Sequence, residues 1–593
     1  MLERWLLRLS VLGVVLVPAG FLAGRILAYG VNVPYMDQWG VADLVVKAFD
    51  GTLSLGDLTF QQNESRLVFP RLLFIGLAYL TGYDVRYEMW GTFGLACLVV
   101  YNVYCLGRLT LGGDRRREVF LLFLASLLIF SLVQWENWFW GIQLCVFVPI
   151  VCVTSILSLS YSSLAVGTKF AASAVLATLS TFSFASGMLC WVVVLPVLVW
   201  QTWEQLKTKP WLMGFWMLSG AVNIGLYFYH YVKPPYHPSF TEALTKPLAA
   251  LRYFCAVLGA LLGGGTNLNA FDQAVGVGFG MSVLFLLACS YVWWHRNESF
   301  VLYRTLGWLT LGSYTLVSAG VTTLGRMGLG MHGALSSRYG ASTFPLIVSL
   351  VYLIPIMLDI NCKKRLPQVA PWMIRCTTVL STVLILLHLG TTKSALKAAE
   401  SDWRNRLQGK AFLLFISTLP RESLTRTMFP DLGALKHWAE GLDRHGLLRP
   451  GLRHSLRIED GELHQSEGVD ECGWFDLLQR TRGETYLARG WAILRQRRQP
   501  ADGIVLAYEE SDRSFTIFDL VTGRVRRPDV ARALRRHRYV HAGWEHSFML
   551  PQVGGKSLKI GAWALDANTG QLCKLQKDFV VDQEKAEIRE VER

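Results

Sequence analysis

Long apolar runs separated by short polar stretches fill the first two thirds of the chain. The runs are about 17–25 residues long, which is the length that crosses the hydrocarbon core of a bilayer. The first run follows Arg4 and Arg8 and is too long for the core of a signal peptide, so we predict an uncleaved span. We predict eleven transmembrane helices at 9–29, 88–110, 118–134, 141–160, 168–184, 188–202, 212–230, 274–294, 303–322, 341–358 and 373–391.

Two further apolar segments, 67–82 and 246–264, either span the membrane or dip into it. If both spanned, Arg115–Arg117 would lie outside, against the rule that short basic loops stay in the cytoplasm. If both dip, Arg115–Arg117 and Lys363–Arg365 are cytoplasmic. We therefore predict re-entrant or membrane-lying helices at both places. This topology puts the N-terminus inside and the C-terminal part outside, as in a bacterial inner-membrane protein with a periplasmic or extracellular domain.

The charge density of the chain changes near residue 390. Lys, Arg, Asp and Glu number 41 in residues 1–390 and 61 in residues 391–593. We predict an all-α multi-pass membrane domain over 1–391 and an extracytoplasmic helical linker over 392–454. Short alternating runs such as Gly503–Tyr508 and Leu558–Leu565, with turns between them, predict an antiparallel β-sandwich over 455–593.

Composition excludes some classes of protein and leaves one question about cysteines. The net charge of +14 fits basic cytoplasmic loops, and no basic stripe with interleaved aromatics indicates nucleic-acid binding. Nine of the 11 Cys are scattered through the membrane part, and no Cys-x-x-Cys motif indicates zinc. Cys472 and Cys573 are alone in the tail and could pair if it is extracytoplasmic.

The first predicted outer loop carries an acid close to the end of the first span. Asp37 is followed by Gln38 and Trp39, and aromatic residues beside an acid suit a sugar face or a lipid headgroup. Asp37 could act as a general base on a hydroxyl, as a metal ligand, or only as a helix cap or turn residue. The apolar residues from Val41 to Phe49 recur at helical spacing and predict an amphipathic helix on the membrane surface.

A second polar cluster, Asn63-Glu64-Ser65-Arg66, lies just before the apolar segment at 67–82. Glu64 could share acid–base work with Asp37, and Arg66 and Arg71 could grip a phosphate. In the alternative interpretation, Asn63 or Ser65 caps the next helix and Arg66 reaches the lipid headgroups.

A third cluster, Gln134 to Gly141, places Glu136 and Asn137 among three Trp residues that include Trp140. An interfacial aromatic belt accounts for the Trp residues but not for the acid and the amide. We therefore predict that Gln134, Glu136, Asn137 and Trp140 line a substrate cavity.

The last polar cluster follows Arg326 and runs from Met331 to Tyr339. Arg338 stands at the outer start of a predicted span, where it could hold a phosphate or pyrophosphate with His332 and Tyr339 nearby. The alternative is an Arg–Tyr pair that anchors the helix at the interface.

The layout of 1–391 resembles the GT-C class of membrane glycosyltransferases. The motifs Met-Asp-Gln-Trp, Asn-Glu-Ser-Arg, Gln-Trp-Glu-Asn-Trp-Phe-Trp-Gly and Ser-Arg-Tyr are also similar to those of uncharacterised bacterial multi-pass proteins. The resemblance implies a polyprenyl-phosphate or -pyrophosphate sugar as donor, Asp37 as the catalytic acid and Arg338 as a phosphate ligand. The first loop has a single Asp rather than an adjacent acidic pair, so a divalent metal is a possible cofactor and not a certain one.

Three functions fit these residues. The first is transfer of a sugar from the lipid-linked donor to a glycan or lipid acceptor at the outer face of the membrane, with Asp37 and Glu64 as catalytic groups. The second is a transporter or flippase of a lipid-linked or anionic substrate. The absence of a sequence repeat and the gathering of ionisable groups at one face argue against the second function. The third is an envelope-glycan assembly protein without catalysis, whose working part is the tail.

Overall fold

The structure is a computed structural model of the whole chain, in which we describe residues 2–235, 237–264, 269–365, 370–419, 427–458, 472–481, 483–510, 514–521, 523–553, 557–582 and 587–591. The chain forms two compact units. The first contains Met1–Gly30, Leu53–Leu77 and Val85–Glu400, and the second contains Val31–Thr52, Ala78–Asp84 and Ser401–Arg593. Each unit is described by itself.

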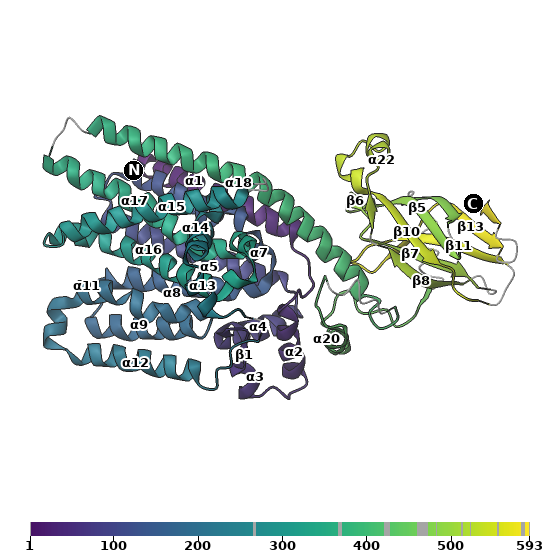
Figure 1. Cartoon of the computed structure of the whole chain (residues 1–593), viewed down its shortest axis with the longest axis horizontal. Helices are drawn as coiled ribbons and strands as arrows, with labels where there is room; N and C mark the ends of the chain where they lie inside the picture. The colour runs from purple at the N-terminus through teal and green to yellow at the C-terminus, as the bar shows by residue number, and fades with distance from the viewer. Residues whose placement is uncertain are drawn as a thin grey trace. The chain divides into compact units, whose positions relative to one another are not determined.

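The first unit is a bundle of helices (Figure 1). Its helices are α1 (Leu2–Tyr29), α3 (Leu55–Thr59), α5 (Arg86–Thr110), α6 (Arg115–Ile129), α7 (Trp135–Phe139), α8 (Leu144–Ser160), α9 (Val166–Thr181), α10 (Cys190–Val193), α11 (Leu195–Thr208), α12 (Trp211–Phe228), α13 (Phe240–Thr245), α14 (Pro247–Gly263), α15 (Ala270–Trp294), α16 (Ser299–Arg326) and α17 (Gly340–Arg365). Helix α4 (Val68–Thr81) begins in this unit and ends in the second, as does the long helix α18 (Ala370–Leu413).

Eight stretches of the described residues are long and apolar enough to cross a membrane. They are Arg86–Thr110, Arg115–Phe139, Gly141–Ser160, Ala185–Thr208, Trp211–Phe228, Ala270–Trp294, Ser337–Ile360 and Arg375–Leu413. Each coincides with one predicted span to within two residues at the ends that fall short, so the prediction of long apolar helices able to span a membrane is confirmed for these eight. The other three predicted spans lie in α1, α9 and α16, and the count of eleven stays a prediction.

Helix α16 is long but less apolar than its neighbours because it lies inside the bundle. Its buried side chains include hydroxyls that bond to the helix's own backbone, such as Thr305 to the carbonyl of Val301 at 2.7 Å. Trp308 is fully buried, and its ring stacks on Tyr352 of α17 with 4.0 Å between ring centroids. A helix surrounded by protein tolerates polar residues that lipid would not.

The two ambiguous apolar segments are helices that are short for a membrane span. Helix α4 has 14 residues and α14 has 17 residues. At 1.5 Å per residue they are about 21 and 26 Å long, against a hydrocarbon core of about 30 Å. Their lengths favour helices that dip into the membrane.

The helical part of the second unit combines the loop after α1 with the end of α18 and the segment that follows it. Helix α2 (Gln38–Phe49) matches the predicted amphipathic helix, but Val41, Leu44 and Val45 are buried in protein. Helix α20 (Leu432–Arg444) contacts α2, where the indole N–H of Trp438 donates to the carboxylate of Asp43 at 3.1 Å. Protein therefore covers the apolar face that we predicted for the membrane surface.

The rest of the second unit is antiparallel β-sheet. One sheet runs β4 (Gly473–Arg480), β5 (Thr485–Leu494), β10 (Gly543–Met549) and β9 (Arg524–Val525), with β6 (Gln499–Pro500) beside β5. The other runs β14 (Ile588–Val591), β13 (Asp578–Asp582), β11 (Ser557–Leu565), β7 (Gly503–Glu509), β8 (Phe515–Val521) and β3 (Arg457–Ile458), with β12 (Leu572–Lys574) beside β11. The predicted region of antiparallel strands is therefore confirmed.

One apolar core contains side chains from both sheets, among them Phe475, Trp544, Leu506 and Ile560. A disulfide between Cys472, next to β4, and Cys573 in β12 also joins the two sheets. Helix α22 (Pro528–Ala533) interrupts the strands.

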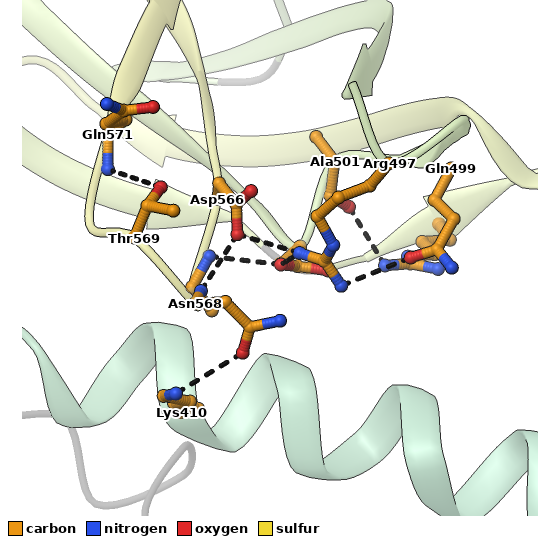
Figure 2. A network of polar contacts seen from close by, with 11 residues as sticks. Lys410, Arg497, Gln499, Ala501, Asp566, Asn568, Thr569 and Gln571 are labelled. Atoms are coloured by element: carbon orange, nitrogen blue, oxygen red, sulfur yellow. Dashed lines mark hydrogen bonds and ion pairs between the residues drawn. The ribbon is translucent and has the colours of Figure 1, made fainter. Parts of the chain in front are cut away.

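A buried polar network supports the loops at one edge of the sheets (Figure 2). The guanidinium of Arg497 bonds to the carboxylates of Asp502 at 2.5 Å and Asp566 at 2.7 Å. The amide oxygen of Asn568 accepts a hydrogen bond from the ammonium of Lys410 in the last turn of α18, at 3.3 Å (Figure 2). The end of α18 is thereby linked to the β-sheet part of its own unit.

Candidate functional site

Glu64 stands at the tip of a two-residue β-hairpin in the first unit. Strand β1 (Gln61–Gln62) pairs antiparallel with β2 (Ser65–Arg66), which leaves Asn63 and Glu64 as the turn. Asn63 has a positive φ of 51°, a conformation that Asn adopts more readily than most residues. The Asn-Glu sequence therefore favours a tight turn that projects Glu64.

Two side chains fix this hairpin to the loop after α12. The amide of Gln61 bonds to both the carbonyl and the N–H of Val232, at 2.6 and 3.0 Å. The guanidinium of Arg66 donates to the carbonyls of Tyr227 at 2.7 Å, Thr59 at 2.9 Å and Tyr229. Arg66 thus supports the hairpin through backbone oxygens, and its role as a phosphate ligand stays a prediction.

Arg71 is also engaged within the protein. It is buried in α4, and its guanidinium donates to the carbonyls of Phe60 at 2.5 Å and Leu58 at 2.9 Å. The amide oxygen of Gln62 lies 3.4 Å from it. The side chain that we predicted to grip phosphate therefore closes the turn between α3 and β1.

The carboxylate of Glu64 lies between a guanidinium and an imidazole. One oxygen, Oε1, is 2.5 Å from Nη2 of Arg326 at the end of α16. The other, Oε2, is 3.6 Å from Nε2 of His237 and accepts no hydrogen bond from the residues that the structure describes. The side chains of Glu64 and Arg326 are 28% and 23% exposed, so this ion pair is largely shielded from water.

Burial and charge shift two ionisation equilibria around Glu64. Burial and the positive charge of Arg326 lower the pKa of His237, against the opposing effect of Glu64. Burial and the negative charge of Glu64 raise the pKa of Tyr231. At neutral pH the imidazole of His237 and the phenol of Tyr231 are therefore neutral beside the ion pair of Glu64 and Arg326.

Arg326 connects this group to the last polar cluster of the sequence. Its guanidinium interacts electrostatically with the hydroxyls of Tyr253 and Tyr339, and Tyr253 interacts in turn with Arg338. The guanidinium of Arg338 lies over the ring of Tyr339, 5.7 Å from its centroid, and no carboxylate of the described residues pairs with it. Electrostatic interactions through Arg326 and Tyr253 thus link predicted residues Glu64, Arg338 and Tyr339.

The predicted cavity wall around Glu136 is a support for that group. Oε2 of Glu136 accepts hydrogen bonds from the hydroxyls of Ser337 at 2.6 Å and Ser336 at 3.1 Å, and from the backbone N–H of Arg338 at 3.0 Å. The amide of Asn137 donates to the carbonyl of Arg338 at 3.0 Å. Glu136 and Asn137 therefore position the backbone of Arg338, and their contact with a substrate stays a prediction.

The other predicted residues of these clusters are in varied surroundings. Gln134 is buried, and its amide donates to the carbonyl of Ile129 at 2.7 Å. Trp140, six positions further along the chain, is also buried. His332 is exposed, with its ring edge against Phe271. Neither of these two contacts brings its residue to Glu64.

Asp37 belongs to the second unit, whereas Glu64 belongs to the first. Asp37 is exposed at the N-cap position of α2, but its carboxylate makes no capping hydrogen bond. The preceding residue, Met36, has a positive φ of 45°, which is costly for a residue with a long side chain. Gln38 and Trp39 are buried in α2. Asp37 thus follows a residue in a strained conformation. The interpretation of Asp37 as a helix cap is not supported, because its carboxylate makes no capping hydrogen bond.

Sequence reasoning missed His237 and gave Arg326 no role. His237 lies in a loop whose Pro residues at 234, 235 and 238 gave no catalytic signal. A search for an acid, a guanidinium and an imidazole at the ends of neighbouring spans would have found the group. Among the described residues, no three His, Cys, Asp or Glu side chains come together as ligands for a metal.

Comparison of the chain with protein-family models, with curated proteins and with solved structures found no match. The function is therefore argued from the residues above.

Proposed function

We propose that this chain is a membrane glycosyltransferase that uses a polyprenyl-phosphate or -pyrophosphate sugar. The observation that carries the proposal is the group of Glu64, Arg326 and His237, with Arg338 and Tyr339 in electrostatic contact. A lipid-phosphate leaving group needs cations, and an acceptor hydroxyl needs a base. Both kinds of residue meet here at the end of α16.

Arg338 is the proposed first ligand of the phosphate. A guanidinium binds two phosphate oxygens at once, and that of Arg338 pairs with no carboxylate of the described residues. Glu136 and Asn137 hold its backbone from both the N–H and the carbonyl side. Arg326 adds a second positive charge, which Glu64 orients.

Glu64 is the proposed proton acceptor. Arg326 bonds to one carboxylate oxygen and leaves the other facing His237. In the reaction, the acceptor oxygen forms a bond to the anomeric carbon as the bond from that carbon to the phosphate oxygen breaks. The bonding electron pair leaves with the phosphate, and the hydroxyl proton passes to Glu64. Asp37 is the acid that the resemblance implies, and it is the alternative base.

We also propose the finer features of the fold and its orientation. Eleven spans would place the end of α18 and the tail outside the cytoplasm. The disulfide between Cys472 and Cys573 supports this orientation because such bonds persist in oxidising compartments. The shared apolar core supports a β-sandwich for the two sheets.

The test is transfer of the labelled sugar from a polyprenyl-phosphate donor to the acceptor, using the purified full chain in lipid. We expect Glu64→Gln to reduce transfer at least a hundredfold with expression unchanged. Glu242→Gln is the matched control, because Glu242 pairs with Lys246 at an exposed site of the same unit. Loss of transfer in Asp37→Asn but not in Glu64→Gln would move the base to Asp37. Full activity in both would refute the proposed chemistry.

A further inference from the structure

A large apolar crevice opens between α6, α15, α17 and α18 in the first unit. Its volume is about 900 Å³, near the upper end of the range for ligand pockets. Most of its lining is aliphatic, for example Leu121 of α6, Met281 of α15, Leu350 of α17 and Leu384 of α18. Such a volume is too large to stay empty in a close-packed interior.

The crevice exists because α18 does not pack closely on the bundle over its first turns. Residues 375–387 of α18 bury no side chain, and the first buried one is His388, whose ring bonds to the hydroxyl of Ser131 at 2.9 Å. On the opposite wall, α15 presents Gly276 and Gly280, one turn apart, and a Cβ added at either would meet nothing within 4 Å. A chain-like apolar molecule fits this space.

One end of the crevice is polar, and its charged lining residues are one Arg and two Asp. Arg117 and Asp359 line it, and Nη1 of Arg117 lies 3.8 Å from Asp359. Asp359 is already bonded to the buried guanidinium of Arg304 at 2.7 Å. Asp114 also lines this end, but one of its carboxylate oxygens accepts the first N–H groups of α6. The two carboxylates are therefore engaged within the protein.

Further cations lie close in sequence to the residues that line this crevice. Arg115 and Arg116 are exposed beside Arg117, and Arg375 is exposed at the start of the described side chains of α18. The sequence also places Lys363–Arg365 shortly after Asp359. This is the face of the bundle that the charge pattern predicts to be cytoplasmic. Exposed basic residues close in sequence to the lining of an apolar crevice suit an anionic headgroup with a hydrocarbon tail.

We propose that this crevice binds an anionic phospholipid. The phosphate lies against Arg117 at the polar end, and the acyl chain fills the space between α18 and the two glycines of α15. The lipid thereby seals α18 against the bundle where protein side chains do not.

This site is separate from the proposed catalytic group. The length of α16 gives the distance between the two sites. Arg304 near its start bonds to Asp359, and Arg326 at its end bonds to Glu64. At 1.5 Å per residue these two Arg residues are about 33 Å apart, which is about the thickness of a hydrocarbon core. A lipid with its phosphate at Arg117 therefore does not reach Glu64, and the inference stands whether or not the chain transfers sugars.

The first experiment fills the crevice. We would purify the full chain in mild detergent and count the phospholipids that remain bound by native mass spectrometry. We expect one anionic phospholipid per chain, and at least a tenfold loss of it in Gly280→Leu, with Gly276→Leu as the second variant. Gly94→Leu on α5 is the control, because Gly94 is exposed and a Cβ added there also meets nothing within 4 Å. The proposal would be overturned if the parent chain retained no phospholipid, or if both crevice variants retained as much phospholipid as the parent chain.

The second experiment tests the headgroup. Delipidated chain is transferred to micelles that contain phosphatidylglycerol or phosphatidylcholine, and its melting temperature is measured. We expect phosphatidylglycerol to raise the melting temperature by several degrees more than phosphatidylcholine, and Arg117→Gln to remove that difference. Arg296→Gln is the control, since Arg296 is exposed after the end of α15 and does not line the crevice. An equal rise with both lipids, or a difference that survives in Arg117→Gln, would show that no anionic headgroup is recognised there.

Discussion

The carboxylate of Glu64 and the guanidinium of Arg326 meet at 2.5 Å although 262 positions separate them in the chain. The pair joins the tip of the β1–β2 hairpin to the end of α16. Because both side chains are more than two-thirds shielded from water, each stabilises the charge of the other.

Breaking this pair should cost stability as well as activity. We expect Glu64→Gln to lower the free energy of unfolding by about 1–3 kcal/mol, since it leaves a partly buried guanidinium with a weaker partner. Arg326→Gln should have a similar effect, and the double variant should lose less than the sum of the two. Thermal unfolding of all four proteins, followed by Trp fluorescence, measures this coupling. Additive losses would show that the two side chains do not interact.

The fold was predictable wherever a long local pattern controls it. The eight long apolar helices and the strands at Gly503–Tyr508 and Leu558–Leu565 follow from apolar runs and alternation. The membership of Val31–Thr52 in the second unit did not follow, because the contact between α2 and α20 joins segments far apart in the chain. Amphipathic spacing shows that a helix has an apolar face but not whether lipid or protein covers it.

The residue types of the candidate site could be predicted from the sequence, but the roles of those residues could be predicted only in part. Glu64, Arg338 and Tyr339 were predicted from polar residues at span ends, and electrostatic interactions link them. Arg66 was predicted to bind phosphate, but three backbone carbonyls occupy its guanidinium. Such carbonyls carry no signal in the sequence. His237 was missed because its partner Glu64 is distant in the chain.

The protonation of His237 should make stability depend on pH in one direction. Burial and Arg326 lower its pKa in the folded protein, so the unfolded chain binds a proton more readily as the pH falls. Stability contributed by the neutral imidazole is therefore complete above the ordinary His pKa of about 6.5 and is lost as the pH falls below it. We expect the melting temperature to fall more steeply from pH 6.5 to 5 in the parent chain than in His237→Gln. His332→Gln is the control, because His332 is exposed. Parallel pH profiles for the parent and His237→Gln would contradict this assignment.

Arg66 and Arg338 should respond differently to the same conservative change. Arg66→Lys removes a guanidinium that donates hydrogen bonds to three backbone carbonyls, so we expect a melting temperature several degrees lower. Arg338→Lys keeps the charge and the contact with Tyr339, so we expect an unchanged melting temperature and at least a tenfold higher KM for the lipid-phosphate donor. Melting curves and donor titrations on the two variants distinguish these roles. A lowered melting temperature in Arg338→Lys with normal KM would make Arg338 a structural residue.

The disulfide between Cys472 and Cys573 should stabilise the β-sheet part of the second unit. The two residues are 101 positions apart, and chain-entropy arguments give up to about 5 kcal/mol for a closed loop of that length. We expect Cys472→Ser with Cys573→Ser to lower the melting temperature as much as reducing agent lowers that of the parent chain. Cys97→Ser, at an exposed thiol of the first unit, is the control. If reductant destabilises the double variant as strongly as the parent, the effect has another origin.

Arg497 should be necessary for the stability of the second unit, because it pairs with the buried carboxylate of Asp502. Asp502 is 2% exposed and depends on Arg497 and on the backbone N–H of Ala567 for compensation. Burial raises the pKa of Asp502, and Arg497 opposes this rise. Arg497→Met leaves the carboxylate without its cation, so we expect a loss of about 3–5 kcal/mol at pH 7.

The sign of the pH dependence makes the prediction about Arg497 specific. Without the guanidinium, the pKa of Asp502 in the folded state rises further above that in the unfolded chain, so the folded state binds the proton more tightly. Stability then falls as the pH rises from the ordinary Asp pKa toward the raised one. We therefore expect the stability difference between the parent and Arg497→Met to be smaller at pH 5 than at pH 8. Arg538→Met, at an exposed position of the same unit, should show no such trend. A difference that is constant between pH 5 and 8 would mean that Asp502 does not carry the uncompensated charge.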